Sequence, residues 1–370
     1  MTGGIRWARF NAPLRFQFKH ASANRTKSSS IIVEASSGSF RGYGEACPRP
    51  YVTGETERSV IAFLRDYGED WISSIRSIES LRARLQDEKD LIDRNPAAFA
   101  ALEIALLDLL AQEQGLSVET LIGLPALSGK IQYSAIVGDS SPLKTRAQAL
   151  VYRLAGFRDF KVKIGADINR DKRRFRSLPR NIRLRVDVNN LYDTAARCVN
   201  HLKALDREIW AIEEPLEAGD VEGQAQLAKE MKARVILDES LCRKAQLPRY
   251  KESALEWIAN VRVSKSGGIL RAIDLARAAQ ELGMDVILGA HVGETSLLSR
   301  AALSVGQALE RPPLAREGAF GRILVTRDVS DPSLRFGAGG VLRTGRWNFA
   351  QRPGLGLFMQ PEALFGDQLS

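Results

Sequence analysis

The stretch FKVKIG, residues 160–165, combines the features of a buried strand with two ammonium groups. Val162 and Ile164 are side chains that a strand in a protein interior favours. Lys161 and Lys163 lie two residues apart, so both point to the same face of such a strand. Because a lysine is almost never buried unless it is paired, we expect this strand to end at a functional site.

Six further short runs rich in valine and isoleucine occur on either side of this stretch. They alternate with amphipathic segments typical of helices, and their apolar character is typical of parallel strands covered by helices. At least seven such strands in series favour a closed (β/α)8 barrel, or TIM-like barrel, over an open sheet, and no GxGxxG motif supports a dinucleotide-binding fold. The runs are KIQYSAIVG, IRLRVDVNN, IWAIEEPL, RVILDESL, WIANVRVSKSGG and DVILGAHVGE.

The first third of the chain has a different pattern, in which strands are followed by helices. SSSIIVEASS and FRGYGEA predict two strands joined by a turn, and NPAAFAALEIALLDLLAQEQG predicts a long helix. Asn95 is the expected N-cap of that helix, Pro96 suits its first turn, and Gly115 suits its end. The expected regions are an α+β domain over residues 1–125, the barrel over residues 126–335, and a segment that packs back on the first domain over residues 336–370.

Ionisable side chains interrupt or close the apolar runs at regular intervals. The successive gaps are 24, 26, 25, 27 and 29 residues, each about the length of one strand–helix unit. In a parallel barrel, side chains spaced by one unit meet at the carboxyl-terminal mouth, where the active sites of such barrels lie. The set consists of Lys163, Asp187, Glu213, Asp238, Lys265 and Glu294.

Asp187, Glu213 and Asp238 are three hard oxygen donors on successive predicted strands. Packed together, they would repel one another, and some would protonate unless a cation joined them. Carboxylate ligands with open positions for water or substrate fit Mg²⁺, and Mn²⁺ could substitute for it. The sequence therefore predicts a magnesium site formed by these three side chains.

Lys163 and Lys265 flank the acidic residues on opposite sides in the order of the strands. A partly desolvated ammonium near a bound divalent cation loses its proton more readily and can then act as a base. A divalent ion that holds a substrate carboxylate also stabilises the enediolate that forms when an α-proton leaves. The two lysines could thus remove a proton from one face and return it to the other. Lys161 could promote deprotonation of Lys163 by repulsion and could also hydrogen-bond the substrate carboxylate.

Each of these side chains also has a structural alternative. A single aspartate at the end of a strand usually caps the next helix, and a single lysine there is usually solvated. It is the regular spacing of the whole set of side chains that favours catalysis. Glu294 could be a neutral acid, a ligand-positioning group or a helix cap, and His291 could be a structural histidine or part of the site. Glu214 and Glu239, which follow two of the carboxylates, are expected to pair with a neighbouring cation such as Arg185 or Lys265.

The segments KVKIG, RVDVNN, AIEEP, LDES and SKSGG, in this order and spacing, resemble the enolase superfamily, and specifically its muconate-lactonizing subgroup. The resemblance covers nearly the whole chain, since GYGEACPRPYVTGET and the long alanine-rich helix resemble the capping domain of that family. It implies a modified barrel with an α+β cap, and it places the metal ligands and the paired bases at the residues named above. The glutamate that assists as an acid would be Glu294, although the segment GAHVGETS differs from the usual motif of the subgroup. His291 lacks the context of the mandelate-type histidine base.

In this family two loops of the cap select the substrate, and here they fall near residues 16–28 and 47–56. The first loop carries a cationic cluster, which implies either a substrate with a second anionic group or a solvated basic loop. LAREGAFGRILV, near the eighth strand, lacks the DxD pair of the subgroup's dipeptide epimerases and has Arg316 nearby, which disfavours a dipeptide substrate. The expected substrate-binding residues are Lys19, His20, Arg25, Tyr51, Thr53 and His291.

These features favour a Mg²⁺-dependent racemase, epimerase or cycloisomerase that acts on a small carboxylate, with a dehydratase or an o-succinylbenzoate-synthase-like lyase as the alternative. A non-catalytic metal-binding barrel, or a polyanion-binding protein attracted by the net charge of +9, ranks lower. The sequence has no nucleic-acid motif and no apolar run of membrane-spanning length. Three cysteines without a CxxC pair favour reduced thiols. We therefore expect a cytoplasmic homo-oligomer with no nucleic-acid or membrane partner.

Overall fold

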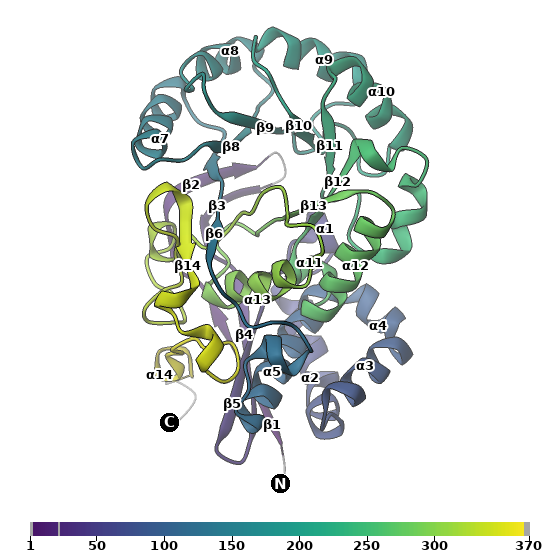
Figure 1. Ribbon diagram of the computed structural model, residues 1–370, viewed down its shortest axis with the longest axis vertical. Helices are drawn as coiled ribbons and strands as arrows, with labels where there is room; N and C mark the ends of the chain where they lie inside the picture. Colours follow the sequence, from purple (N-terminus) through teal and green to yellow (C-terminus); the bar gives the residue numbers. More distant parts are fainter. Residues whose placement is uncertain (1–2, 21–22, 366–370) are drawn as a thin grey trace.

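The computed structural model describes residues 3–20 and 23–365, without the side chains of residues 16–20, 23–25 and 255. Figure 1 shows two parts that share a broad contact: a curled sheet surrounded by helices, and a smaller sheet with its own helices. The smaller part contains the start of the chain, and the last segments of the chain return to its side. Within the described ranges, no helix is both long and apolar enough to cross a membrane.

The larger part consists of strands and helices that alternate along the chain. Its strands are β6 (Lys130–Gln132), β7 (Ala135–Val137), β8 (Asp159–Lys163), β9 (Arg183–Asp187), β10 (Ala211–Glu213), β11 (Arg234–Leu237), β12 (Trp257–Val261) and β13 (Asp285–Leu288), and its helices are α7 (Pro142–Leu154), α8 (Ile168–Arg176), α9 (Ala195–Ala204), α10 (Val221–Met231), α11 (Val263–Ser266), α12 (Ile269–Glu281) and α13 (Ser296–Gln307).

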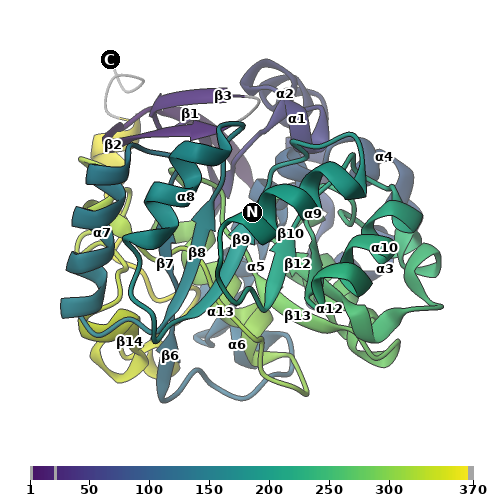
Figure 2. The same ribbon diagram turned by 90° about the horizontal axis from the view of Figure 1, so that it is seen from above.

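Strands β7 to β13 form one parallel sheet in which consecutive strands are neighbours. Figure 2 shows the helices α7, α8, α9 and α10 on the outside of this curled sheet. An irregular segment lies between its two edges: Glu317 N donates to Leu288 O at 2.8 Å on the β13 side, and Ser134 N donates to Arg316 O at 2.9 Å next to β7. This segment takes the place of an eighth strand, so the ring closes as the predicted barrel requires.

The smaller part is the α+β cap, which also receives the C-terminal segments. Its strands are β1 (Gly4–Phe10), β2 (Pro13–His20), β3 (Ala23–Lys27), β4 (Ser30–Ser37) and β5 (Phe40–Ala46), its helices are α1 (Pro50–Thr53), α2 (Glu57–Ser74), α3 (Ile78–Asp87), α4 (Lys89–Arg94), α5 (Pro96–Gln114) and α6 (Val118–Leu121), and the C-terminal elements are β14 (Val341–Arg343) and α14 (Pro361–Phe365).

Helix α5 is the buried centre of the cap. It ends at Gly115, which has a left-handed φ of 65° as the sequence predicts. Asn95 occupies the N-cap position, but its side chain donates to Leu91 O at 3.0 Å instead of capping. The carboxylate of Glu55 accepts the free amides of the first turn instead. The helix packs closely on β5, because a Cβ at Gly44 would collide with the carbonyl oxygen of Ala101.

Two buried carboxylates of the cap bind the barrel directly. Glu103 accepts hydrogen bonds from Ile269 N at 2.9 Å and Leu270 N at 2.8 Å, at the start of α12. Glu45 accepts from Thr295 N at 3.0 Å, just before α13. The first amides of a helix have no partner within it, so each carboxylate satisfies groups that would otherwise be unpaired. The cap and the barrel are therefore held in one arrangement.

The C-terminal segment contacts both parts. Strand β14 pairs with β6 at the start of the barrel region. Leu355 N donates to Asp108 Oδ1 of α5 at 2.7 Å, and the guanidinium of Arg6 lies 4.3 Å from the centre of the Phe365 ring. These contacts support the expected return to the cap, while the limits of the three regions stay a prediction.

The free energy of unfolding is expected to fall as the pH rises from about 5 to about 7, in part because of Glu103. Burial raises the pKa of Glu103 from 4.5 to about 7, although the two backbone amides oppose this. Between the unfolded pKa and the folded pKa, Glu103 keeps its proton in the folded state and loses it in the unfolded state. The contribution that is fully present below the unfolded pKa is therefore lost as the pH rises through the folded pKa. The free energy of unfolding falls by at most about 3 kcal/mol for this reason.

Urea unfolding at pH 5 and pH 8 measures this contribution. Glu103→Gln should show a smaller difference in unfolding free energy between the two pH values than the wild type. Glu113→Gln, on the exposed face of the same helix, is the matched control and should keep the wild-type difference. An unchanged difference in Glu103→Gln would show that Glu103 is ionised in the folded protein at both pH values.

Candidate active site

Five of the predicted side chains meet at one end of the parallel sheet. Lys163 pairs in register with Asp187, and Asp187 with Glu213. Asp238 directly follows β11, and Lys265 lies in α11, shortly after β12. All five are buried. The order around the mouth is therefore lysine, aspartate, glutamate, aspartate, lysine, with one group from each of five neighbouring units.

Lys161 lies among three carboxylates. Its Nζ is 2.7 Å from Glu213 Oε1, 3.1 Å from Asp187 Oδ2 and 3.1 Å from Glu317 Oε1. Burial alone would lower the pKa of Lys161, but these three charges outweigh it and raise the pKa above its ordinary value. Lys161 is thus a cation across the physiological pH range. It shares Asp187 Oδ2 with Lys163, so the two side-chain nitrogens lie close together, while the effect of Lys161 on Lys163 stays a prediction.

Lys163 is oriented by Asp187 at the end of the adjacent strand and by Asn189 in the turn after it. Its Nζ lies 3.1 Å from Asp187 Oδ2 and donates to Asn189 Oδ1 at 2.8 Å. Asn189 has a left-handed φ of 51°, which asparagine tolerates better than most residues, and its amide donates to Asp187 Oδ1. The turn after β9 thus fixes the position of the Lys163 ammonium.

Lys265 approaches from the other side of the carboxylates. Its Nζ donates to Asp238 Oδ1 at 2.7 Å and also to the Asp238 carbonyl oxygen. Arg262 forms an ion pair with the other oxygen of Asp238 and lies 3.5 Å from Glu213 Oε1. Asn260 Nδ2 donates to the same Glu213 oxygen at 3.1 Å.

The three carboxylates suit a hard divalent cation, but basic side chains of the protein lie between them. In the described part of the chain, no three histidine, cysteine or acidic side chains are spaced as a complete metal site. Lys161 and Arg262 instead bridge the carboxylates of Asp187, Glu213 and Asp238. A metal held by all three carboxylates therefore requires these two side chains to turn aside.

Glu213 shows why a metal would be favourable here. Its Oε2 is buried and accepts no hydrogen bond from any residue whose side chain is described. Burial raises the pKa of Glu213 above its ordinary value, Lys161 opposes this, and the charges of Asp187, Glu317 and Asp238 raise it further. A divalent cation would supply a partner for the free oxygen and relieve the repulsion among the carboxylates.

The predicted pairing of Glu214 with a cation is wrong. Glu214 has a left-handed φ of 39°, and its carboxylate turns to the next loop, where it accepts from Ser240 N and Ser240 Oγ, both at 2.8 Å. Arg185 instead pairs with Asp159 and, at 2.9 Å, with Glu317. Glu239 also forms no ion pair with the side chains that the structure describes. Glu214 therefore shapes the loop that carries Asp238.

Glu317 and Arg262 are members of the site that were not predicted from the sequence. Glu317 lies in the irregular segment that replaces the eighth strand, and it bridges Lys161 and Arg185. It comes 23 residues after Glu294 (317 − 294), close to the spacing of the other site residues. That spacing could have identified Glu317. Arg262 carries a similar signal, because it directly follows β12 and comes 24 residues after Asp238 (262 − 238).

Glu294 and His291 line a cavity of about 100 Å³ beside Glu317. Glu294 Oε2 accepts from His291 N at 2.9 Å, and its Oε1 accepts from Ser299 Oγ at 3.1 Å, so the carboxyl closes the turn before α13. Burial raises the pKa of Glu294 to about 8, and Glu45 adds to this effect. Glu294 is therefore mostly neutral at pH 7, which is compatible with both a neutral acid and a structural cap.

Of the two predicted substrate loops, the second, residues 47–56, is described in full, and the first, residues 16–28, is described only in part. The side chains of Lys19, His20 and Arg25 lie outside the described residues; only their backbone is placed, in the hairpin of β2 and β3. The second loop contains α1, where Tyr51 is partly buried. Thr53 lines a hollow of about 170 Å³ together with Lys265.

The second loop is fixed against the barrel. Cys47 N donates to Ser264 Oγ at 3.0 Å, next to Lys265, and the buried Arg49 donates to Val292 O at 2.8 Å. These bonds hold the loop over the mouth of the barrel.

Comparison with known proteins agrees with this arrangement. Residues 5–123 match the model of the mandelate racemase / muconate lactonizing enzyme N-terminal domain, and residues 144–363 match the enolase C-terminal domain-like model. The L-Lys-D/L-Arg epimerase of Methylococcus capsulatus is 30% identical over 93% of this chain and 95% of that protein. The N-succinyl-L-Arg/Lys racemase of Bacillus cereus is 25% identical over 95% of this chain and 94% of that protein.

A solved structure shows the same architecture. The dipeptide epimerase from Methylococcus capsulatus, complexed with Mg and the dipeptide L-Arg-D-Lys, superimposes with a TM-score of 0.80 and 29% identity, over 97% of this chain and 100% of that chain. The chain is therefore an enzyme of the enolase superfamily and belongs to its mandelate racemase / muconate lactonizing enzyme family, with the predicted TIM-like barrel and α+β cap.

Proposed function

We propose that the protein is a Mg²⁺-dependent racemase or epimerase that removes the proton α to a substrate carboxylate and returns it on the opposite face. The observation that carries this proposal is the placement of Lys163 and Lys265, which contact the outer carboxylates, Asp187 and Asp238, from opposite ends of the acidic row. The racemase and epimerase activities named for the two relatives support the same reaction type.

Asp187, Glu213 and Asp238 would hold the metal ion. Mg²⁺ is present with the dipeptide in the solved relative, and Mn²⁺ has similar ligand preferences and would substitute for it. When bound, the ion supplies positive charge beside the substrate carboxylate, where negative charge develops as the α-proton leaves.

The two lysines have complementary roles. The unprotonated lysine takes the α-proton, and the protonated lysine on the other face donates one, so that each direction of the reaction uses them in opposite order. Asn189 keeps the Lys163 ammonium in position, and the carbonyl oxygen of Asp238 does the same for Lys265. Lys161 stays protonated and offers a cation to the substrate carboxylate.

The proposed substrate is a small carboxylate with a second anionic group, such as an N-acyl amino acid whose acyl chain ends in a carboxylate. The basic residues of the β2–β3 hairpin support this choice, and so does the similarity to an N-succinyl amino acid racemase. Tyr51, Thr53 and His291 complete the proposed contacts with the substrate.

Substitution of Lys19 and Arg25 by alanine is expected to raise KM for such a substrate about tenfold or more, because a charge-assisted hydrogen bond contributes roughly 1.5–3 kcal/mol. The value of kcat should change little, since the proposed role of these residues is to bind the second anionic group and not to transfer the proton. The matched control is Lys203→Ala with Arg173→Ala, which removes the same charges from exposed positions on the barrel. If KM is unchanged when Lys19 and Arg25 are replaced, these residues do not bind a second anionic group of the substrate.

Exchange of the α-proton with solvent deuterium tests the reaction type. A set of N-succinyl amino acids and acidic dipeptides is incubated with the enzyme and Mg²⁺ in D₂O. A racemase incorporates deuterium starting from either enantiomer and produces the other one. A cycloisomerase or a lyase would instead consume the substrate without inverting it, and that result would replace the proposed reaction.

A further inference from the structure

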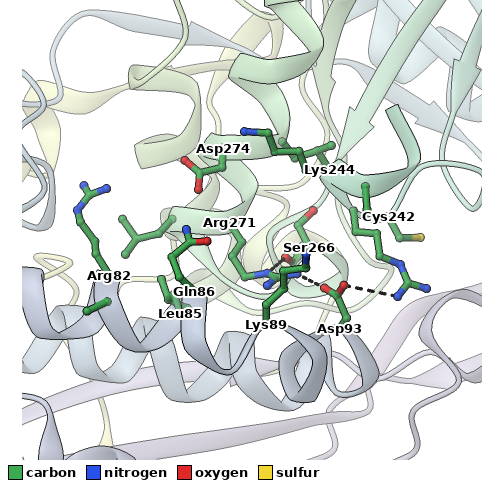
Figure 3. A pocket seen from close by; sticks show the side chains of 15 residues that line it. Arg82, Leu85, Gln86, Lys89, Asp93, Cys242, Lys244, Ser266, Arg271 and Asp274 are labelled. Carbon is green, nitrogen blue, oxygen red and sulfur yellow. Dashed lines mark hydrogen bonds and ion pairs between the residues drawn. The ribbon is translucent and has the colours of Figure 1, made fainter. Parts of the chain in front are cut away.

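A larger hollow lies at the contact between the cap and the barrel, outside the ring of ionisable side chains. Its volume is about 750 Å³, within the range of small-molecule sites. Figure 3 shows α3 and α4 of the cap on one side, and the barrel elements that carry Lys244, Ser266 and Asp274 on the other. We call this hollow the seam pocket and define it by Arg82, Lys89, Arg243, Lys244, Ser266 and Arg271.

Positive charge dominates the lining of the seam pocket. Five cations and two carboxylates line it, which gives a net charge of +3 (5 − 2). Asp93 is already neutralised, because it forms ion pairs with Arg271 (Figure 3) and with Arg243.

Three cations remain without a carboxylate partner. Arg82, Lys89 and Lys244 form no ion pair with any side chain that the structure describes, and Arg82 makes only a long hydrogen bond, 3.5 Å, to Ile122 O. Arg82 and Lys89 belong to the cap and Lys244 to the barrel, and all three are exposed, so both parts contribute charges to the rim of the hollow (Figure 3).

A buried hydroxyl gives an independent indication of a ligand. Ser266 is only 4% exposed and lines the seam pocket, yet its Oγ has no hydrogen-bond partner among the described residues. Nearly all buried polar groups in proteins are hydrogen-bonded, either to protein atoms or to a bound molecule. The Ser266 hydroxyl, beside a cationic cavity, is therefore available to a polar ligand.

We propose that the seam pocket is a second binding site, separate from the reaction centre, for a small polyanion that also carries a hydroxyl group. The three unpaired cations select a ligand with more than one negative charge. Asp274, which forms no ion pair with the side chains that the structure describes, accepts a hydrogen bond from the ligand's hydroxyl. Because the ligand contacts both parts, its binding strengthens their association.

The site adjoins the catalytic machinery. Ser266 follows Lys265 in the chain, and the smaller hollow that contains Lys265 and Thr53 shares Asp93 and Ser266 with the seam pocket. A polyanion in the seam pocket therefore lies next to the segment that positions Lys265.

Calorimetric titration with citrate, which has three carboxylates and a hydroxyl, tests this proposal on metal-free full-length protein at low ionic strength. The test variant combines Arg82→Ala, Lys89→Ala and Lys244→Ala. The matched control combines Arg173→Ala, Lys203→Ala and Lys229→Ala, which removes three exposed charges of the same types from α8, α9 and α10. The wild type and the control should bind one citrate, and the Kd of the test variant should be at least about tenfold higher.

Two further measurements locate the binding. Citrate should raise the thermal unfolding temperature of the wild type and the control but not that of the test variant, while all three unfold alike without citrate. A crystal soaked in citrate should show it against Lys244 and Ser266. The proposal is overturned if citrate does not bind, if all three proteins bind it equally, or if it lies between Lys163 and Lys265.

Discussion

Alanine at Lys163 or at Lys265 is expected to lower kcat by about 10²–10⁴-fold, the usual contribution of a general acid or base. The two variants should differ in the face of the substrate α-carbon from which they still remove a proton. Each retains one base, so each should exchange the α-proton of one substrate enantiomer with D₂O and lose exchange of the other. Measurement of deuterium incorporation for both enantiomers by NMR resolves this difference.

Lys203→Ala is the control for these variants, because it removes an exposed lysine of the same barrel. Its exchange rates should equal those of the wild type. If either of the two site variants exchanged both enantiomers at the wild-type rate, that lysine would have no role as a base. Equal loss on both faces in both variants, with the fold intact by circular dichroism, would instead favour a single base and a supporting cation.

The substitution Glu213→Gln is expected to weaken Mg²⁺ binding by at least about 100-fold. Even changes outside the direct ligands of a metal cost 10–100-fold in affinity, and Glu213 is the central member of the acidic row. The amide cannot supply the negative charge that a hard cation requires. Calorimetric titration with Mg²⁺ measures the change in Kd, and activity should fall in parallel.

The matched control is Glu230→Gln, which removes the same charge from an exposed position on α10. It should bind Mg²⁺ as the wild type does. Lys161 keeps Asp187 and Glu317 as partners in the Glu213 variant, so the variant should fold. If Glu213→Gln bound Mg²⁺ with the affinity of the wild type, Glu213 would not be a ligand of the metal.

The barrel could be predicted from the sequence because its strands are short apolar runs at regular spacing. The same spacing identified five side chains that the structure brings together, since neighbouring parallel strands end at one edge. Glu317 could be recognised only by its spacing of 23 residues after Glu294, because the segment that closes the ring, LAREG, has no apolar run typical of a strand.

Other features depend on local geometry or on distant contacts that a pattern does not contain. The left-handed backbone at Glu214 turns its carboxylate toward the next loop, away from Arg185. The ion pairs of Arg262 with two carboxylates, and the capping of α5 by Glu55 in place of Asn95, arise from residues far apart in the chain. The seam pocket likewise combines cap and barrel residues that no local motif links.

The most direct test of the central claim is the structure of a crystal grown with Mg²⁺. Our account predicts one ion bound by oxygens of Asp187, Glu213 and Asp238 at about 2.1 Å, with Lys161 and Arg262 turned aside and with Lys163 and Lys265 on opposite sides of it. Carboxylates that stay bridged by Lys161 and Arg262 at saturating Mg²⁺, with no ion between them, would contradict it.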